Sequence, residues 1–94
     1  MDERTEPRRQ PAQDKRIGVV GIVVEDRLKS AGKVQEILTR HGDVIVGRLG
    51  LPYRGRDVAV IALIVDGTTD EIGALTGKLG SIPGVLVKSA LTSK

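Results

Sequence analysis

A strand, a capped helix start and a second strand follow one another over residues 57–91, and this succession constrains the fold most. Residues 58–65 are apolar at every position, so both faces of a strand there would be apolar. Such a strand is buried on both faces and lies inside a sheet. Thr68 precedes Glu71 at the spacing by which a hydroxyl and a carboxylate each satisfy a free backbone N–H at a helix start. The pattern predicts a helix over 69–79.

A similar unit lies upstream of this one. Residues 17–24 are apolar or small on both alternating faces, which again predicts a buried strand, and a further strand is predicted over 43–49. Between these strands, five residues share one face at helical spacing: Ala31, Val34, Ile37, Leu38 and His41. Gly42 and Gly80 end the two helical stretches, and the last strand follows over 85–91. The predicted order of elements is β-α-β-β-α-β.

This order predicts an α+β fold, the ferredoxin-like sandwich with a four-stranded antiparallel sheet and two helices on one face. The first and third strands should be central. The positions of the charged residues Arg48 and Lys88 support this assignment, because they lie in the second and fourth strands, at the edges of the predicted sheet. The helices leave one face of the sheet uncovered, although the central strands are apolar on both faces. We therefore expect a homo-oligomer, dimer or tetramer, that associates through this face or through strand edges.

Residues 1–16 contain prolines, mixed charges and no apolar run, so they bury too little surface to offset the entropy of ordering. We expect a flexible tail over 1–16 and one folded domain over 17–94. The chain has no Cys, which excludes disulfides and thiolate-bound metal. It has a net charge of +3 but no Phe or Trp on which bases could stack. Without a secretory signal or a membrane-spanning run, it is expected to be soluble and cytoplasmic.

Residues suited to catalysis or metal binding are scarce. His41 is the only histidine, whereas a metal site needs several convergent ligands. We expect His41 to end a helix, where a positive charge suits the helix dipole. Gly73, Gly77 and Lys78 superficially resemble a phosphate loop, but the spacing is too short and the segment lies inside a helix. No catalytic residue, metal site or cofactor is predicted, and the chain is not expected to be an enzyme.

Two turns carry the candidate ligand-binding residues, Glu25, Asp26 and Arg27 in the first turn and Tyr53, Arg54 and Arg56 in the second. Tyr53 is the sole aromatic residue and lies beside arginines that could bind a carboxylate or a phosphate. The second turn is predicted over residues 50–56, where Pro and Gly supply the backbone angles. The alternative interpretation is that the charged residues of both turns are ordinary solvated loop residues without a binding role.

Four segments, residues 15–27, 42–53, 65–80 and 83–90, resemble the iron-only ([FeFe]) hydrogenase system regulator family. The resemblance implies an ACT-like ferredoxin fold and a regulatory role beside the maturation of [FeFe]-hydrogenase. The fold would also be related in shape to the ligand-binding half of nickel-responsive repressors. The chain departs from those repressors because it lacks their His and Cys ligands and their DNA-binding segment.

The leading hypothesis is a homo-oligomeric ACT-like module that senses a small molecule or docks on a partner protein. ACT-like domains commonly place effectors at a subunit junction near the first β-α turn, where Gly18 and Gly21 would leave room. The alternative is a transcriptional regulator that contacts DNA through basic residues of the tail: Arg8, Arg9, Lys15 and Arg16. A third hypothesis is a structural assembly factor without a ligand. DNA binding by the chain alone and membrane binding are not expected.

Overall fold

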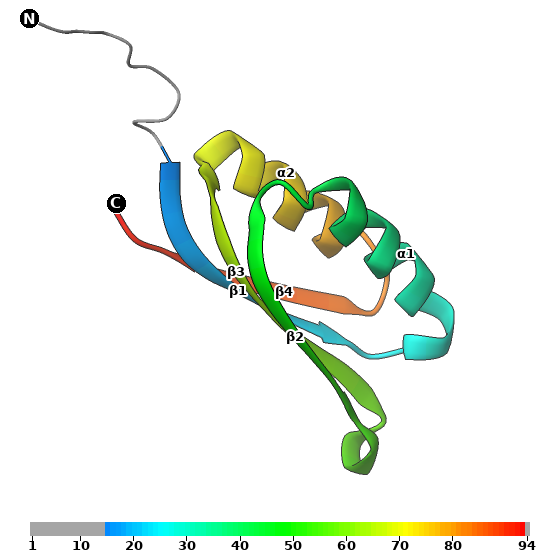
Figure 1. Cartoon of the computed structure of the whole chain (residues 1–94). Helices are drawn as coiled ribbons and strands as arrows, with labels where there is room; N and C mark the ends of the chain where they lie inside the picture. Colours follow the sequence, from blue (N-terminus) through cyan, green and yellow to red (C-terminus); the bar gives the residue numbers. More distant parts are fainter. Residues whose placement is uncertain (1–14, 94) are drawn as a thin grey trace, which may run out of the picture.

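The computed structural model describes residues 15–93 and confirms the predicted order of elements (Figure 1). The elements are β1 (Lys15–Val24), α1 (Arg27–Arg40), β2 (Ile45–Tyr53), the 3₁₀ turn η2 (Arg54–Arg56), β3 (Val58–Thr68), α2 (Thr69–Gly80) and β4 (Val85–Leu91). The described strands form one antiparallel four-stranded sheet in the order β2-β3-β1-β4. The first and third strands are therefore central, as the sequence predicts, and the fold is ferredoxin-like.

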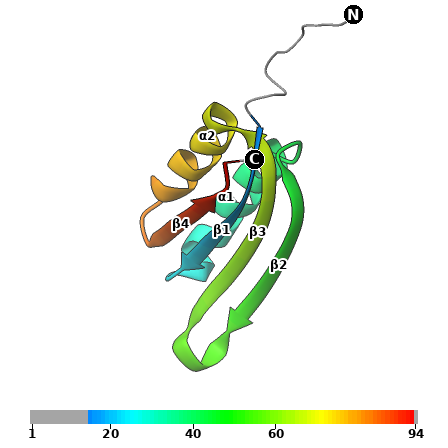
Figure 2. The ribbon, with the colours of Figure 1, turned by 90° about the vertical axis from the view of Figure 1, so that its left-hand side faces the viewer.

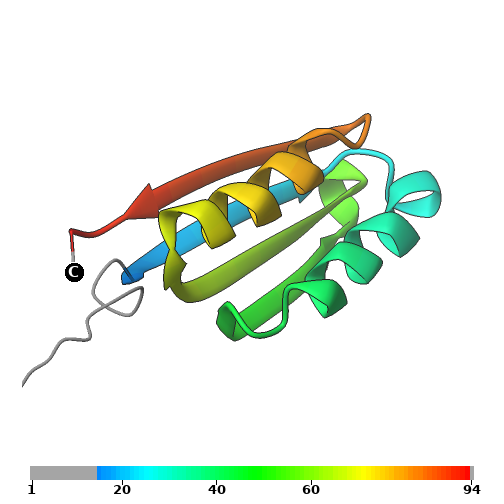
Figure 3. The same ribbon diagram turned by 90° about the horizontal axis from the view of Figure 1, so that it is seen from above.

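Both described helices lie on one face of the sheet, and β4 forms the border of the sheet next to α2 (Figures 1 and 3). The hairpin of β2 and β3 extends past the ends of the helices (Figure 2). Alternate residues of β1 and β3 point toward the helices and form the core with apolar residues of α1 and α2. The largest fully buried side chains are Val20, Ile22, Val24, Val34, Leu38, Leu63, Val65, Ile72, Leu75 and Leu79.

The buried face of α1 differs from the predicted one. Ala31 is exposed, while Ser30 is 4% exposed and takes the expected place of an apolar residue in the buried face. The Ser30 hydroxyl donates a hydrogen bond to the Pro83 carbonyl oxygen over 3.2 Å. A buried hydroxyl is tolerated only when it has such a partner. This partner comes from the loop between α2 and β4, which the spacing of residues along α1 alone does not reveal.

The boundaries of two strands also differ. β1 begins at Lys15, two residues before the expected domain start, and the rest of the expected tail, residues 1–14, lies outside the described residues. β2 runs from Ile45 to Tyr53, so the prediction of a turn over 50–56 is wrong in its first half. Gly50, Leu51 and Pro52 pair with β3 despite their turn-forming residue types. Pro is accepted there because β2 is an edge strand.

The helix start at Thr68 forms as predicted. The Glu71 backbone N–H donates to the Thr68 hydroxyl oxygen over 3.1 Å, and the Thr68 N–H donates to the Glu71 carboxylate over 2.8 Å. This is a complete capping box. Gly67, just before it, is buried, and a Cβ at this position would lie 3.0 Å from the Val44 side chain. The absence of a side chain at Gly67 therefore allows the start of α2 to lie close to the loop before β2.

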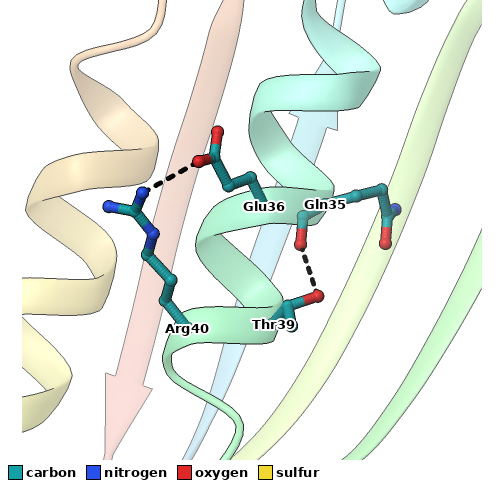
Figure 4. A network of polar contacts seen from close by, with 4 residues as sticks. All are labelled: Gln35, Glu36, Thr39 and Arg40. Atoms are coloured by element: carbon teal, nitrogen blue, oxygen red, sulfur yellow. Dashed lines mark hydrogen bonds and ion pairs between the residues drawn. The ribbon is translucent and has the colours of Figure 1, made fainter.

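The sheet face opposite the helices, which we call the open face, is covered by no element of residues 15–93. Its apolar side chains come from all four described strands and are about half exposed or more: Ile17, Val19, Leu49, Leu51, Tyr53, Ile64 and Leu86. The C-terminal half of α1 exposes polar side chains by contrast (Figure 4), although Leu28 near the start of the helix is also exposed. There Arg40 forms an ion pair with Glu36 at 2.9 Å, and the Thr39 hydroxyl donates to the Gln35 carbonyl oxygen over 2.9 Å. This half of α1 therefore presents a surface suited to water, whereas the open face does not.

Candidate ligand-binding site

Three connections meet at one end of the sheet. β1 ends at Val24, which is paired with Ala59 at the start of β3 and with Val85 at the start of β4. The first β-α turn, the β2–β3 hairpin and the α2–β4 loop therefore lie at the same end. The Glu25 backbone N–H donates to the Gly84 carbonyl oxygen over 2.7 Å, which joins the first turn to the α2–β4 loop.

Local hydrogen bonds fix the first turn. The Lys29 backbone N–H donates to the Asp26 carboxylate over 3.2 Å, so Asp26 caps α1. Gly84 has a φ of 78°, a left-handed conformation that favours glycine, and this allows the α2–β4 loop to approach Glu25 and Asp26. Of the predicted residues, Asp26 thus has a structural role whether or not it binds a ligand.

A cavity of about 450 Å³ lies between the start of α1 and the α2–β4 loop. Its α1 side is lined by Asp26, Lys29, Ser30 and Lys33, and its other side by residues 82–84. Neither lysine was predicted from the sequence as a binding residue. A signal was present, because Lys29 and Lys33 are one helical turn apart and no acidic residue lies in the first turn of α1. Cations at a helix N-terminus oppose the helix dipole, and an anion bound there would offset this effect.

A second cavity, of about 300 Å³, lies on the other side of the first turn. It is lined by Glu25, Asp26, Arg27, Leu28 and Asp57. The structure therefore brings the three predicted residues of the first turn together with a hairpin residue, Asp57, that the sequence analysis did not select. Asp57 ends η2 in a left-handed conformation with a φ of 54°. This conformation turns the chain from η2 into β3.

The predicted residues of the second turn lie apart from these two cavities. Tyr53 is the last residue of β2 and is half exposed on the open face, and Arg54 and Arg56 are exposed in η2. Neither cavity at this end includes them in its lining. The two predicted groups thus share one end of the sheet, and neither cavity there joins them.

The expectation that Gly18 leaves room for a ligand is wrong. A side chain at Gly18 would collide with the side chain of Leu91 and come within 2.7 Å of the Ala90 carbonyl oxygen. The missing side chain at Gly18 therefore makes room for Leu91, within the same chain. Gly21 points to the open face, where a Cβ would meet the Lys88 carbonyl oxygen at 3.9 Å.

His41 lies at the opposite end of the domain, where it caps the C-terminus of α1 as predicted. Its Nε2 atom is buried and has no hydrogen-bond partner in the described part of the chain. Burial lowers the pKa of His41, and the charges of Lys78 and Arg40 lower it further. The expected positive charge at this helix end is thus disfavoured. Within residues 15–93, no three His, Cys, Asp or Glu side chains are grouped so as to hold a metal ion.

A family model described as "TM1266-like: Iron-only hydrogenase system regulator, putative" matches residues 16–89 of the chain. No curated protein matches the chain. Among solved structures, the uncharacterized protein TM1266 from Thermotoga maritima is 44% identical, with a TM-score of 0.79 over 82% of this chain and 96% of that one.

Two further solved structures share the fold at low sequence identity. The C-terminal domain of the MgtC protein from Mycobacterium tuberculosis is 15% identical, with a TM-score of 0.65 over 85% of this chain and 90% of that one. The ACT domain of GTP pyrophosphokinase from Chlorobium tepidum is 18% identical, with a TM-score of 0.63 over 86% and 90%. These likenesses establish the ACT-like fold. Separately, none of the helices within residues 15–93 has the length and apolar character needed to cross a bilayer.

Proposed function

Because this chain belongs to the TM1266-like family of iron-only hydrogenase system regulators, we propose that it is a regulatory module that senses a small anionic effector as a homo-oligomer. The effector site is the 450 Å³ cavity beside the first β-α turn. The observation that carries this proposal is the pair Lys29 and Lys33, placed along the cavity at the start of α1. A carboxylate or phosphate group there receives charge-assisted hydrogen bonds from both ammonium groups and is favoured by the helix dipole.

The surroundings of the cavity suit regulation. Its walls come from α1 and from the α2–β4 loop, so a bound effector links two segments far apart in the sequence. An effector that binds only the folded state stabilises it according to its concentration relative to the dissociation constant. Binding at this place would therefore stiffen the contact between the first turn and the loop, where Ser30 already bonds to Pro83.

The homo-oligomer is supported by the open face. A contiguous apolar surface of this kind on a small domain is typical of an interaction surface. A direct role in DNA binding has less support, because Lys15 and Arg16 belong to β1 and the Arg16 guanidinium donates to the Thr92 carbonyl oxygen over 3.5 Å. Arg8 and Arg9, the other basic residues expected to contact DNA, lie outside the described residues.

A thermal-shift screen with carboxylate- and phosphate-bearing metabolites tests the effector site. With the stabilising compound in hand, Lys33→Gln should weaken binding about tenfold or more, since a hydrogen bond to a charged group contributes about 1.5–3 kcal/mol. Asp26→Asn should not weaken binding, because Asn caps a helix as well as Asp does and the change removes a negative charge from the cavity lining. Lys78→Gln, which removes an exposed lysine of α2, is the matched control.

Other results of these experiments would support a different binding site or a different function. If Arg54→Gln weakens binding and Lys33→Gln does not, the effector binds at the hairpin. If no compound of either class stabilises the chain, docking on a partner protein becomes the better account of the regulatory role. Nanomolar, sequence-dependent binding to promoter DNA, lost when residues 1–14 are removed, would favour the transcriptional regulator instead.

A further inference from the structure

The β2–β3 hairpin carries an apolar row that no element of residues 15–93 covers. Leu49, Leu51 and Tyr53 are 70%, 58% and 51% exposed. They alternate along β2, so they point to the same side of the hairpin. Two exposed arginines, Arg54 and Arg56, follow the row at the tip of the hairpin. We call these five residues the arm surface.

The two arginines of the arm surface have no partner within residues 15–93. Neither guanidinium group forms a hydrogen bond or an ion pair there. Arg48 differs, because it points to the other side of β2 and donates to the Gln35 Oε1 atom of α1 over 2.6 Å. The carboxylate that follows the tip, Asp57, lines the cavity beside the first β-α turn. Arg54 and Arg56 are therefore available to bind an anionic group from outside.

The composition of this segment is typical of a protein-binding surface. Residues 44–56 contain three Arg and the only Tyr of the chain, and no Asp, Glu or Lys. In protein interfaces, Tyr and Arg are enriched among the residues that contribute most to affinity, whereas Lys, Glu and Asp are depleted. The C-terminal half of α1 has the opposite character, with Glu36 and Arg40 paired to each other in solvent (Figure 4).

The position of the hairpin leaves the arm surface accessible. The hairpin extends past the ends of the helices (Figure 2), and no residue from 49 to 57 is buried. A two-stranded hairpin without buried side chains gains little stability of its own. Leu49 and Leu51 thus contribute little to the folding of this domain. Their apolar side chains leave water only when another molecule covers them.

A partner binds this surface through side chains and not by adding a strand. The register of β2 shifts between Ile45 and Gly47, and Pro52 has no backbone N–H to offer. Bulges and proline protect an edge strand from pairing. The exposed groups that remain are the apolar row and the two guanidinium groups.

These groups also distinguish between classes of partner. A second copy docked arm to arm would face the same patch, since a twofold contact joins identical surfaces. Arg54 and Arg56 would then meet their own copies, and like charges across an interface are unfavourable. A nucleic acid would bind the arginines through its phosphates but would leave the leucines in water. A partner with both carboxylates and apolar side chains uses the whole surface.

We propose that the arm surface docks on another protein, through an acidic segment with apolar residues at its centre. The apolar side chains of the segment cover Leu49, Leu51 and Tyr53, and its carboxylates accept hydrogen bonds from Arg54 and Arg56. The row from Leu49 to Tyr53 extends for about 14 Å, at about 3.4 Å a residue. A helix covers this length in about nine residues. This inference goes beyond the proposed function, because the arm surface contacts a target and the effector cavity is a separate site.

The sole tyrosine of the chain allows a direct test. The full chain labelled biosynthetically with fluorotyrosine gives one fluorine NMR resonance, which reports on Tyr53 and hence on the arm surface. The probes are peptides of about twelve residues, long enough to cover the row, selected from a random library for binding to the full chain. The selected peptides should be rich in acidic and apolar residues and should shift the Tyr53 resonance. Their analogues with Gln for Glu and Asn for Asp should bind about tenfold more weakly.

Variants of the chain locate the contact. Arg54→Gln and Arg56→Gln should each weaken binding of the selected peptides about tenfold, and Leu51→Ala should weaken it by a similar factor. All three positions are exposed, so the folded domain should accept these changes. Arg40→Gln is the matched control, because it removes an exposed arginine at the other end of the domain. Lys33→Gln, in the effector cavity, should also leave peptide binding unchanged.

Three results would overturn the inference. Selected peptides that lack acidic residues, or that leave the Tyr53 resonance unchanged, would show that the arm surface does not bind such a segment. Duplex DNA or vesicles of phosphatidylcholine and phosphatidylglycerol that shift this resonance at physiological salt, when the peptides do not, would assign the surface to a polyanion or a membrane. A change in the light-scattering mass of the chain alone on Arg54→Gln would place the arm surface in the homo-oligomer. Effector binding is measured by thermal shift, so the proposed function is tested separately.

Discussion

The covered face and the open face of the sheet are built from the same kinds of side chain and have opposite surroundings. Leu63 and Ile64 are neighbours in β3, yet Leu63 is fully buried under the helices and Ile64 is 51% exposed. Their partners in β1, Val20 and Val19, differ in the same way. Apolar composition therefore does not decide burial in this domain. The side of the sheet on which the helices pack decides it.

The largest effect is expected from truncating the covered face. Leu63→Ala should lower the free energy of unfolding by about 2–5 kcal/mol, since it removes buried methyl groups and leaves a cavity. Ile64→Ala, one residue along the strand, should lower it by less than about 1 kcal/mol, as expected for an exposed position. Urea denaturation of both variants at low protein concentration measures the difference.

The same two variants can also refute the conclusion that the covered face is buried and the open face is exposed in solution. Equal losses for Leu63→Ala and Ile64→Ala would mean that the open face is buried in solution. Repeating the Ile64→Ala measurement over a range of protein concentrations would identify association as the cause, because dimer stability depends on concentration.

A smaller loss of stability is expected from a change in the capping box at the start of α2. Thr68→Ala should lower the free energy of unfolding by about 1 kcal/mol, because it removes one half of the capping box. Hydrogen bonds from Thr68 lower the pKa of Glu71 below 4.5. The stabilisation from ionised Glu71 is present above pH 4.5 and is lost as the pH falls through its folded-state value. In Thr68→Ala this acid-dependent loss should be weaker, and an unchanged pH profile would contradict the role of the box.

The smallest effect is expected at His41, at the end of α1. Its pKa in the folded state lies below 6.5, so the unfolded chain binds a proton more readily. Stability should therefore fall as the pH drops from 6.5 toward the folded-state pKa, and should be constant with respect to this group above that range. Melting temperatures at pH 7.5 and 5.5 should differ less for His41→Gln than for the wild type. Equal differences in the two proteins would show that His41 is not protected from protonation.

Much of the fold was predictable from residues 17–91. The capping box of Thr68 and Glu71, the doubly apolar central strands and the order of elements are local patterns, and the structure confirms them. The errors occur where distant segments meet. Ser30 replaces Ala31 in the core because Pro83 supplies its hydrogen bond. Likewise, β2 continues through Pro52 because β3 lies beside it.

The candidate site was predicted less completely than the fold. Glu25, Asp26 and Arg27 were selected from their place in a turn, and the structure puts them beside Asp57 in one cavity. Lys29 and Lys33 were missed because helix periodicity treats them as solvated residues. They line a cavity only because the α2–β4 loop lies across from them.

The sequence by itself determined the elements of this protein, since strand and helix patterns and caps depend on neighbours within a few residues. It also determined that both faces of the central strands are apolar. Only the tertiary structure decided which face the helices cover and which charges border a cavity. Those outcomes depend on contacts between segments far apart in the chain, such as Ser30 with Pro83 and β1 with β4, which no local pattern encodes.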